Sequence, residues 1–169
     1  MKFKTFIKDK KYIWKILIIM ALVLVDLATK VYFANYFESG NSNINLLGGL
    51  ITLTYVRNTG AAFGVLANNT IFLAIISAIF VIAFTLIDVY QKRQDWLYAV
   101  AYSIMMAGAL GNLVDRLFLN YVRDFIKFSM FGFVCNWADI CICVGVTLYL
   151  LSLIINVVKE SKKDKIDEK

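Results

Sequence analysis

The sequence contains no histidine and few charged residues. Without histidine, serine-hydrolase triads and histidine-ligated zinc or di-iron centres are excluded. Any acid–base chemistry must therefore use carboxylates, lysine or tyrosine. Charged residues make up 18% of the 169 residues and hydrophobic residues 60%, whereas about a quarter of a typical soluble domain is charged. This composition indicates a chain embedded in a membrane.

Cysteine is also scarce, and the three residues are Cys135, Cys141 and Cys143. An odd number without a CxxC pair argues against a disulfide framework and against a zinc knuckle. We expect these cysteines to be apolar packing residues. We expect neither a metal nor a cofactor.

Long apolar runs separate clusters of basic residues. Four runs approach the roughly 20 residues that cross about 30 Å of hydrocarbon at about 1.5 Å per residue. They predict an all-α polytopic membrane protein with one domain over residues 1–169. The expected transmembrane helices are at about 13–33, 71–89, 96–114 and 137–158, with outer loops at 34–70 and 115–136. The first run has no small-residue cleavage site, so we expect a retained helix rather than a signal peptide.

The basic residues set the expected orientation. Of the 18 lysines and arginines, six lie at the N-terminus, two in the turn at 90–95 and five in the tail, which gives 13. By the positive-inside rule, both termini and this turn are cytoplasmic and the loops 34–70 and 115–136 face outward. The net charge of +6 is then explained by the orientation of the chain in the membrane, and we expect no nucleic-acid partner. The charged tail at 159–169 is expected to be solvated and frayed.

The first outer loop is expected to contain a small extracytoplasmic β segment. A Gly/Ser/Asn loop at 39–45 precedes residues 48–56, where apolar and polar residues alternate with the period of a half-buried strand. We expect this segment to rest on the membrane surface, where it is suited to cradle a peptide.

The acidic residues indicate a site at the outer leaflet. Seven of the twelve, Asp88 among them, fall on the cytoplasmic side, where solvation accounts for them. The other five are Asp26, Glu38, Asp115, Asp124 and Asp139. The helical rise brings Asp26, Asn112 and Asp139 to one depth, and no comparable cluster is expected at the inner leaflet. Ionisable residues inside spans mark function more often than surface charges do.

Helical spacing groups several of these polar residues. Asp26 and Lys30 are four residues apart, which favours an ion pair that supports the site rather than reacting. On the third span, one helix face carries Gly108, Asn112, Asp115 and Arg116. Gly111 and Ala107 add a spacing of small residues that allows close helix approach. A purely structural network is the alternative interpretation.

The remaining candidates lie in the outer segments. Asn58 and Gly60 begin a stretch of small residues that allows close backbone approach, or that forms an ordinary turn. Asp124 and Asp139 favour a carboxylate dyad, in which one acid activates water while the other protonates the substrate. From the pattern alone, a proton or ion relay is a close alternative.

Five ordered motifs resemble the lipoprotein signal peptidase family, also called type II or prolipoprotein signal peptidases. The motifs are Asp26-Leu-Ala-Thr-Lys30, Asn58-Thr-Gly-Ala-Ala-Phe63, Gly111-Asn-Leu-Val-Asp-Arg116, Val122-Arg-Asp-Phe-Ile126 and Asn136-Trp-Ala-Asp139. The resemblance covers almost the whole chain. Ala107 replaces a usual glycine and Cys135 a usual phenylalanine, and neither change removes a group that the mechanism needs.

The resemblance implies a bacterial membrane aspartyl endopeptidase. Such enzymes remove signal peptides from diacylglyceryl-modified prolipoproteins, cut before the lipidated cysteine, and are inhibited by globomycin. Carried over by motif, the catalytic pair is Asp124 and Asp139. The implied substrate-positioning or supporting residues are Asp26, Lys30, Asn58, Gly60, Gly108, Asn112, Asp115, Arg116 and Asn136. The implied location is the cytoplasmic membrane, with membrane lipid as a partner and the active site at the outer leaflet, and we expect a monomer.

Two non-enzymatic interpretations compete with this one. A channel or proton-coupled transporter would use Asp26, Asp115 and Asp139 as a relay, which calls for acids spread through the membrane depth. A scaffold would use the polar cluster only to hold four helices together.

Overall fold

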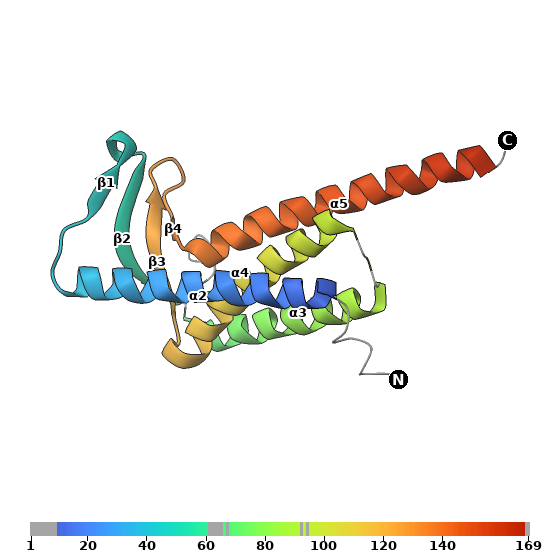
Figure 1. Ribbon diagram of the computed structural model, residues 1–169. Coiled ribbons are helices and arrows are strands. Elements are labelled where there is room, and N and C mark those ends of the chain that lie inside the picture. The colour runs from blue at the N-terminus through green and yellow to red at the C-terminus, as the bar shows by residue number, and fades with distance from the viewer. Residues whose placement is uncertain (1–9, 61–65, 67, 92, 94, 168–169) are drawn as a thin grey trace.

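Four long helices and a small sheet make up the computed structural model of the chain, which describes residues 10–60, 66, 68–91, 93 and 95–167. The helices are α2 (Lys10–Glu38), α3 (Thr70–Gln91), α4 (Trp96–Leu119) and α5 (Trp137–Asp167). The strands are β1 (Ile44–Leu46), β2 (Ile51–Asn58), β3 (Val122–Phe128) and β4 (Val134–Cys135), and the short 3-10 helix η1 (Leu47–Gly49) joins β1 to β2. The sheet lies at one end of the helices, opposite the start of α2 and the end of α5 (Figure 1).

All four helices are long and apolar enough to cross a membrane, which confirms the predicted four-helix fold. They also extend beyond the predicted spans, most of all α5. Its 31 residues reach about 46 Å at about 1.5 Å per residue, against about 30 Å of hydrocarbon. The expectation of a frayed tail is therefore wrong as far as Asp167. The lysines and glutamate there are good helix formers, and Asn156 donates to Glu160 one turn further on at 3.2 Å.

The central helix is α4, which packs against α2, α3 and α5 and is the most buried of the four. Two glycines permit this arrangement. A Cβ atom on Gly108 would collide with the backbone oxygen of Ala138 in α5, and one on Gly111 would collide with the carboxylate of Asp26 in α2. The close helix approach expected at Gly111 is confirmed, and Gly108 provides a second close approach to a different helix.

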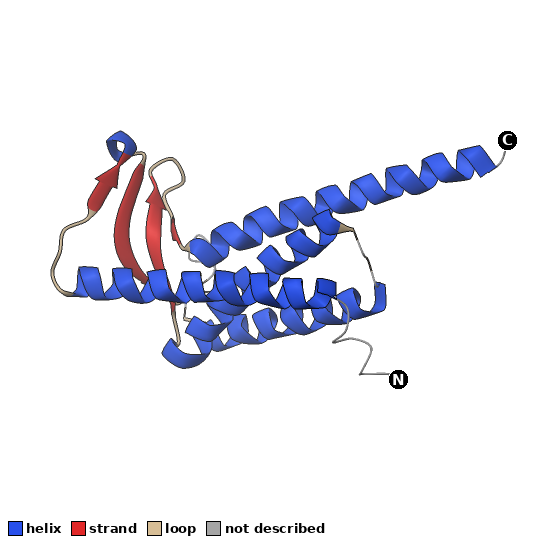
Figure 2. Ribbon diagram, in the orientation of Figure 1, coloured by secondary structure: helices blue, strands red, loops and turns tan. Residues whose placement is uncertain are grey.

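The sheet is antiparallel with strand order β1-β2-β3-β4 (Figure 2). The expected strand is present as β2. The segment 115–136, which the sequence predicts to be an outer loop, is not only a loop, because α4 continues to Leu119 and both β3 and β4 follow. Part of the expected loop at 39–45 belongs to β1. These strands form through pairing with distant residues, which a local alternation of apolar and polar residues does not reveal.

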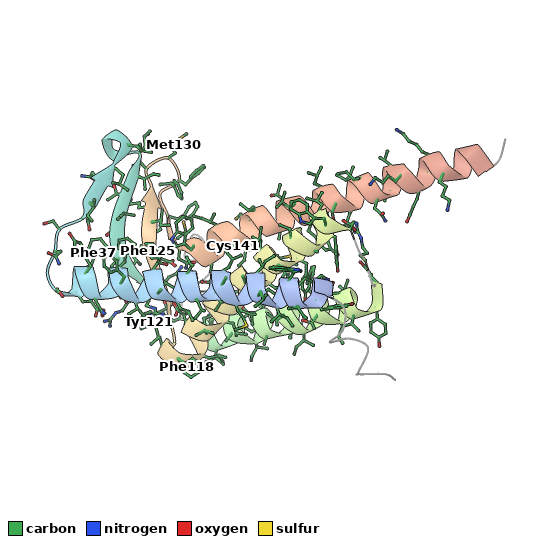
Figure 3. All side chains as sticks on the ribbon, in the orientation of Figure 1. Phe37, Phe118, Tyr121, Phe125, Met130 and Cys141 are labelled. Atoms are coloured by element: carbon green, nitrogen blue, oxygen red, sulfur yellow. The ribbon has the colours of Figure 1, made fainter. Side chains whose placement is uncertain are left out.

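Apolar contacts fix the sheet onto the helices. Phe125 and Ile126 of β3 are buried with Cys135 in one cluster, and Ile140 of α5 packs against it. The ring of Phe125, which is labelled in Figure 3, stacks on that of Phe33 of α2 with centroids 4.6 Å apart. Strand β3 therefore lies against the same ends of α2 and α5 that carry the polar residues described next.

Candidate active site

Lys30 of α2 is fully buried and contacts Asp26 of its own helix together with two residues of α4. Its Nζ lies 2.8 Å from Asp26 Oδ2 and 3.6 Å from Asp115 Oδ2, and it donates to Asn112 Oδ1 at 2.9 Å. The predicted pair of Asp26 and Lys30 is thus confirmed. Asp26 Oδ1 also accepts the N–H of Ala138 at 2.9 Å, in the first turn of α5, where the helix dipole favours a negative charge. These contacts hold α2, α4 and α5 at one level.

Asp139 is held at both of its carboxylate oxygens. Asn112 Nδ2 donates to Oδ1 at 2.7 Å, so one amide side chain links Lys30 to Asp139. The N–H of Asn136 donates to Oδ2 at 3.1 Å, while the N–H of Asp139 donates to Asn136 Oδ1 at 3.0 Å. This reciprocal pair is a capping box at the start of α5. The residues that begin the helix therefore also orient this carboxylate.

Asp124 of β3 is 1% exposed and accepts two side-chain amides. Asn136 Nδ2 donates to its Oδ1 at 2.6 Å, and Asn58 Nδ2 donates to its Oδ2 at 2.8 Å. Asn136 consequently touches both Asp124 and Asp139. The register of β2 and β3 shifts between Leu53 and Val56, and β-bulges of this kind often re-aim side chains beside functional sites.

The environment of Asp124 favours its protonated form. Burial raises the pKa of Asp124 to about 7, and the nearby negative charge of Asp139 adds to the rise, while the amides of Asn58 and Asn136 oppose it. Asp139 itself is only half-buried. A carboxyl that holds a proton near neutral pH therefore lies beside one that reaches solvent.

Arg116 and Gly60 close another side of this cluster. Arg116 Nη2 donates to the backbone oxygen of Gly60 at 3.4 Å, and the Gly60 N–H donates to Asn58 Oδ1 at 2.9 Å. Positions 61–63 of the second motif lie outside the described residues. Arg116 also lines a pocket of about 240 Å³ whose other walls are largely apolar side chains of α3 and α4.

Arg123 is a member of this cluster that the sequence interpretation missed. Its backbone N–H and Nε donate to Asp115 Oδ2 at 3.0 and 3.2 Å, and its Nη2 donates to Asp115 Oδ1 at 2.5 Å. The available signal was that Arg123 is one of only five basic residues outside the three basic clusters. Every predicted site residue lies in or against this network, with Gly108 serving as the contact surface for α5.

The expectation that solvation accounts for Asp88 on the cytoplasmic side is wrong. It is buried on α3, and Lys15 Nζ of α2 lies 2.5 Å from its Oδ1. The Lys15 Nζ also lies 5.3 and 5.2 Å from the ring centroids of Tyr98 and Tyr102 on α4. Sequence position suggested an aqueous boundary, but side chains from two other helices cover the carboxylate.

No cluster of three or more His, Cys, Asp or Glu side chains suited to a metal ion occurs in the described part of the chain. Cys135 lies beside Asn136 in the core, as expected of a packing residue, whereas Cys143 is exposed on α5. Burial raises the pKa of Cys135 to about 12, and the charges of Asp139 and Asp124 add to this, so its thiol stays neutral.

Comparison with known proteins places these residues in a family. Residues 18–155 match the family described as signal peptidase (SPase) II. The lipoprotein signal peptidase of Lactiplantibacillus plantarum is 36% identical over 143 residues, covering 83% of this chain and 95% of that protein. The lipoprotein signal peptidase of Staphylococcus aureus is 34% identical over 161 residues, covering 92% and 97%.

Solved structures agree with the sequence comparison. A bacterial membrane enzyme determined by the in meso method at 2.3 Å resolution superposes with a TM-score of 0.75 at 30% identity, covering 85% of this chain and 88% of that one. A second bacterial membrane enzyme, determined at 1.9 Å, gives a TM-score of 0.69 at 32% identity over 82% and 91%.

Proposed function

The chain belongs to the signal peptidase II family of aspartic-type signal peptidases, and we propose that Asp124 and Asp139 are its catalytic pair. Membership gives the coarse activity, which is cleavage of signal peptides from prolipoproteins in a bacterial membrane. The observation that carries the proposed mechanism is that Asn136 contacts both acids. Its side-chain amide nitrogen donates to Asp124, while its backbone N–H and amide oxygen hydrogen-bond with Asp139.

The proposed reaction is general acid–base attack of water on the peptide bond. The ionised carboxylate of the pair takes a proton from water as the water oxygen attacks the scissile carbonyl carbon. The protonated carboxyl gives its proton to the carbonyl oxygen. When the C–N bond of the resulting tetrahedral intermediate breaks, the carboxyl that took the proton from water gives it to the leaving nitrogen. The other carboxylate takes a proton back from a hydroxyl of the intermediate, so the pair again holds one proton. The raised pKa of Asp124 supports this division because one proton is retained near neutral pH.

The other site residues have two proposed roles. Asn58, Asn112, Arg116 and Asn136 position the substrate and the carboxyl groups. Asp26, Lys30, Asp115, Gly60 and Gly108 support them through the buried contacts described above. Strand β2 is suited to cradle the signal peptide, and the apolar pocket beside Arg116 is compatible with a lipid-bearing substrate.

The proposed substrate is a diacylglyceryl-modified prolipoprotein, cut before the lipidated cysteine. Its acyl chains remain in the bilayer while the scissile bond reaches the outer leaflet. The basic residues support cytoplasmic termini, which would put the sheet end of the helices outside. We further propose a single membrane domain that acts as a monomer and is inhibited by globomycin.

Cleavage of a diacylglyceryl prolipoprotein by purified protein in detergent tests this proposal. The wild-type protein is compared with the Asp124→Asn and Asp139→Asn variants by gel shift, with thermal unfolding as the check on folding. We expect cleavage by the wild type and a loss of at least about 10³-fold in both folded variants. Cleavage that survives in either variant would contradict the pair. Folded variants of reduced stability with unchanged cleavage would favour the scaffold.

A further inference from the structure

Arg123 makes an unusual set of contacts for a residue next to a proposed catalytic acid. Asp115 of α4 is completely buried, and Arg123 supplies three N–H donors to its carboxylate. Two of these come from the guanidinium group, which contacts both carboxylate oxygens in the fork geometry that makes such pairs strong. Lys30 approaches the same carboxylate at 3.6 Å.

This contact fixes the backbone immediately before Asp124. Successive side chains of a strand point to opposite sides, so Arg123 and Asp124 are held from opposite sides of β3. Asp115 anchors Arg123 to α4, while Asn58 and Asn136 hold the Asp124 carboxyl on the other side. A shift of β3 along α4 would therefore move Asp124 away from its amide partners.

Arg123 also completes a balance of charges. The buried or half-buried carboxylates of the site are those of Asp26, Asp115, Asp124 and Asp139. The cations among them are Lys30, Arg116 and Arg123. Two further charged residues on elements that reach the sheet, Arg57 of β2 and Glu38 of α2, are exposed and pair with each other at 2.6 Å. Four negative and three positive charges become neutral when the catalytic pair holds one proton.

From this geometry we infer that Arg123 is a positioning residue, which anchors β3 to α4 through Asp115 and keeps the Asp124–Asp139 pair singly protonated. The inference rests on the proposed function for its kinetic consequences. Without the guanidinium charge, the cluster would carry a negative charge even with one proton on the pair. A second proton would then bind at higher pH, and the form with one proton would also persist to higher pH.

The test compares three variants in the cleavage reaction across pH. Arg123→Met removes the charge and keeps a long apolar stem, Arg123→Lys keeps the charge, and Lys127→Met removes an exposed charge from the same strand. For Arg123→Met we expect kcat to fall about 10-fold or more with little change in KM, because a small displacement of a catalytic group is costly. We expect both limbs of its pH profile to move up by about 0.5–1 pH unit.

The controls separate positioning from simple loss of structure. Arg123→Lys should restore the pH profile and part of kcat, and Lys127→Met should match the wild type in both. An unshifted profile in Arg123→Met, or an equal shift in Lys127→Met, would overturn the inference while wild-type cleavage left the proposed function intact.

A second measurement does not depend on catalysis. Carbon-13 NMR of labelled aspartate, assigned with Asp124→Asn, follows the protonation of Asp124 in the wild type and in Arg123→Met. We expect its midpoint to move upward in Arg123→Met. An unchanged midpoint would overturn the inference whether or not the wild-type protein cleaves substrate. Absence of cleavage by the wild type would separately defeat the proposed function.

Discussion

The helix bundle contains a buried lysine–aspartate contact at each end, and the two differ in what surrounds them. At the end away from the sheet, called the inner end below, Lys15 has Asp88 as its carboxylate partner and also lies over tyrosine rings. At the end next to the sheet, called the outer end below, Lys30 contacts two carboxylates and the amide of Asn112, and Asn112 in turn donates to the half-buried Asp139. A buried ion pair by itself is therefore no sign of a site. What distinguishes the outer end is a series of hydrogen bonds from Lys30 through Asn112 to the solvent-accessible carboxylate of Asp139.

The helix segments between the two ends argue against the relay interpretation. The stretch of α2 between Lys15 and Asp26 contains no acidic or basic residue, and neither does α3 between Thr70 and Asp88. A proton or ion crossing the membrane would thus find ionisable groups at both ends and none on these helices between them. We therefore expect the two ends to act as separate structures, so that each can be altered without the other.

The two ends should differ most in their effect on cleavage when each buried lysine is replaced in turn. Lys30→Met leaves Asp26 and Asp115 without their shared cation, so we expect a loss of about 3–5 kcal/mol in the free energy of unfolding. Asn112 loses the partner that orients it toward Asp139, and kcat/KM per folded molecule should fall about 100-fold. Denaturant unfolding and cleavage assays measure the two effects.

Lys15→Met is the matched control for that experiment. It also leaves a buried carboxylate unpaired, so its stability should fall by a similar amount. Its kcat/KM per folded molecule should equal that of the wild type. If Lys15→Met reduced cleavage as much as Lys30→Met, the two ends would be coupled and the comparison would fail.

Both residues of the inner pair can also be replaced by apolar side chains. The double variant Lys15→Met with Asp88→Leu removes both charges and supplies apolar volume in their place. Because the desolvation cost of both ions disappears, we expect stability within about 1 kcal/mol of the wild type, or above it. Thermal unfolding in detergent measures this. A double variant less stable than Lys15→Met alone would mean that Asp88 has a role beyond pairing with Lys15.

The two ends should also differ in how stability depends on pH, because the outer end contains Asp124. The pKa of Asp124 is raised to about 7 in the folded protein, against about 4 for an unperturbed aspartate, so the folded state binds the proton more tightly. Its contribution to stability is fully present below about pH 4 and is lost as pH rises toward 7, at up to about 1.4 kcal/mol per pH unit. Asp124→Asn should lack this slope when the unfolding temperature is followed across pH. A slope that persists in the variant would assign it to another group.

The smallest effect is expected at Cys135, which adjoins the site without taking part in its polar contacts. Its thiol is buried and its pKa is raised to about 12, so thiol reagents should leave the folded enzyme active. Cys135→Ala should change kcat/KM less than about threefold and cost about 1 kcal/mol of stability. Rapid inactivation of the wild type by N-ethylmaleimide, absent in Cys135→Ala, would show that the site opens to solvent there.

Helical parts of the site follow from the sequence because helical contacts are local. The four-residue spacing of Asp26 and Lys30 and the shared face of Asn112 and Asp115 depend only on the helical turn. Asp88 was misjudged because its burial depends on Lys15, which lies 73 positions away in the chain. Sequence position gives depth along a helix but not what covers its side.

The strands were harder to predict for the same reason. β3 follows α4 after Asn120, whose left-handed backbone (φ 64°) turns the chain back so that Arg123 meets Asp115. The spacing of eight residues between Asp115 and Arg123 does not by itself specify that reversal. Motif resemblance identified Asp124 as important, but the contacts that hold it come from β2 and from the start of α5, and these required the fold.

The central position of α4 has a consequence for how the chain enters the membrane. This helix has the lowest mean hydropathy of the four and carries Asn112, Asp115 and Arg116, whereas α3 has the highest. During synthesis α4 meets lipid before α5 exists to cover it, and its polar residues then oppose insertion. Only four residues separate α3 from α4, so the two can insert as a hairpin in which α3 supplies the favourable transfer energy. The helix that contributes most to the site thus depends on its neighbour for its place in the bilayer.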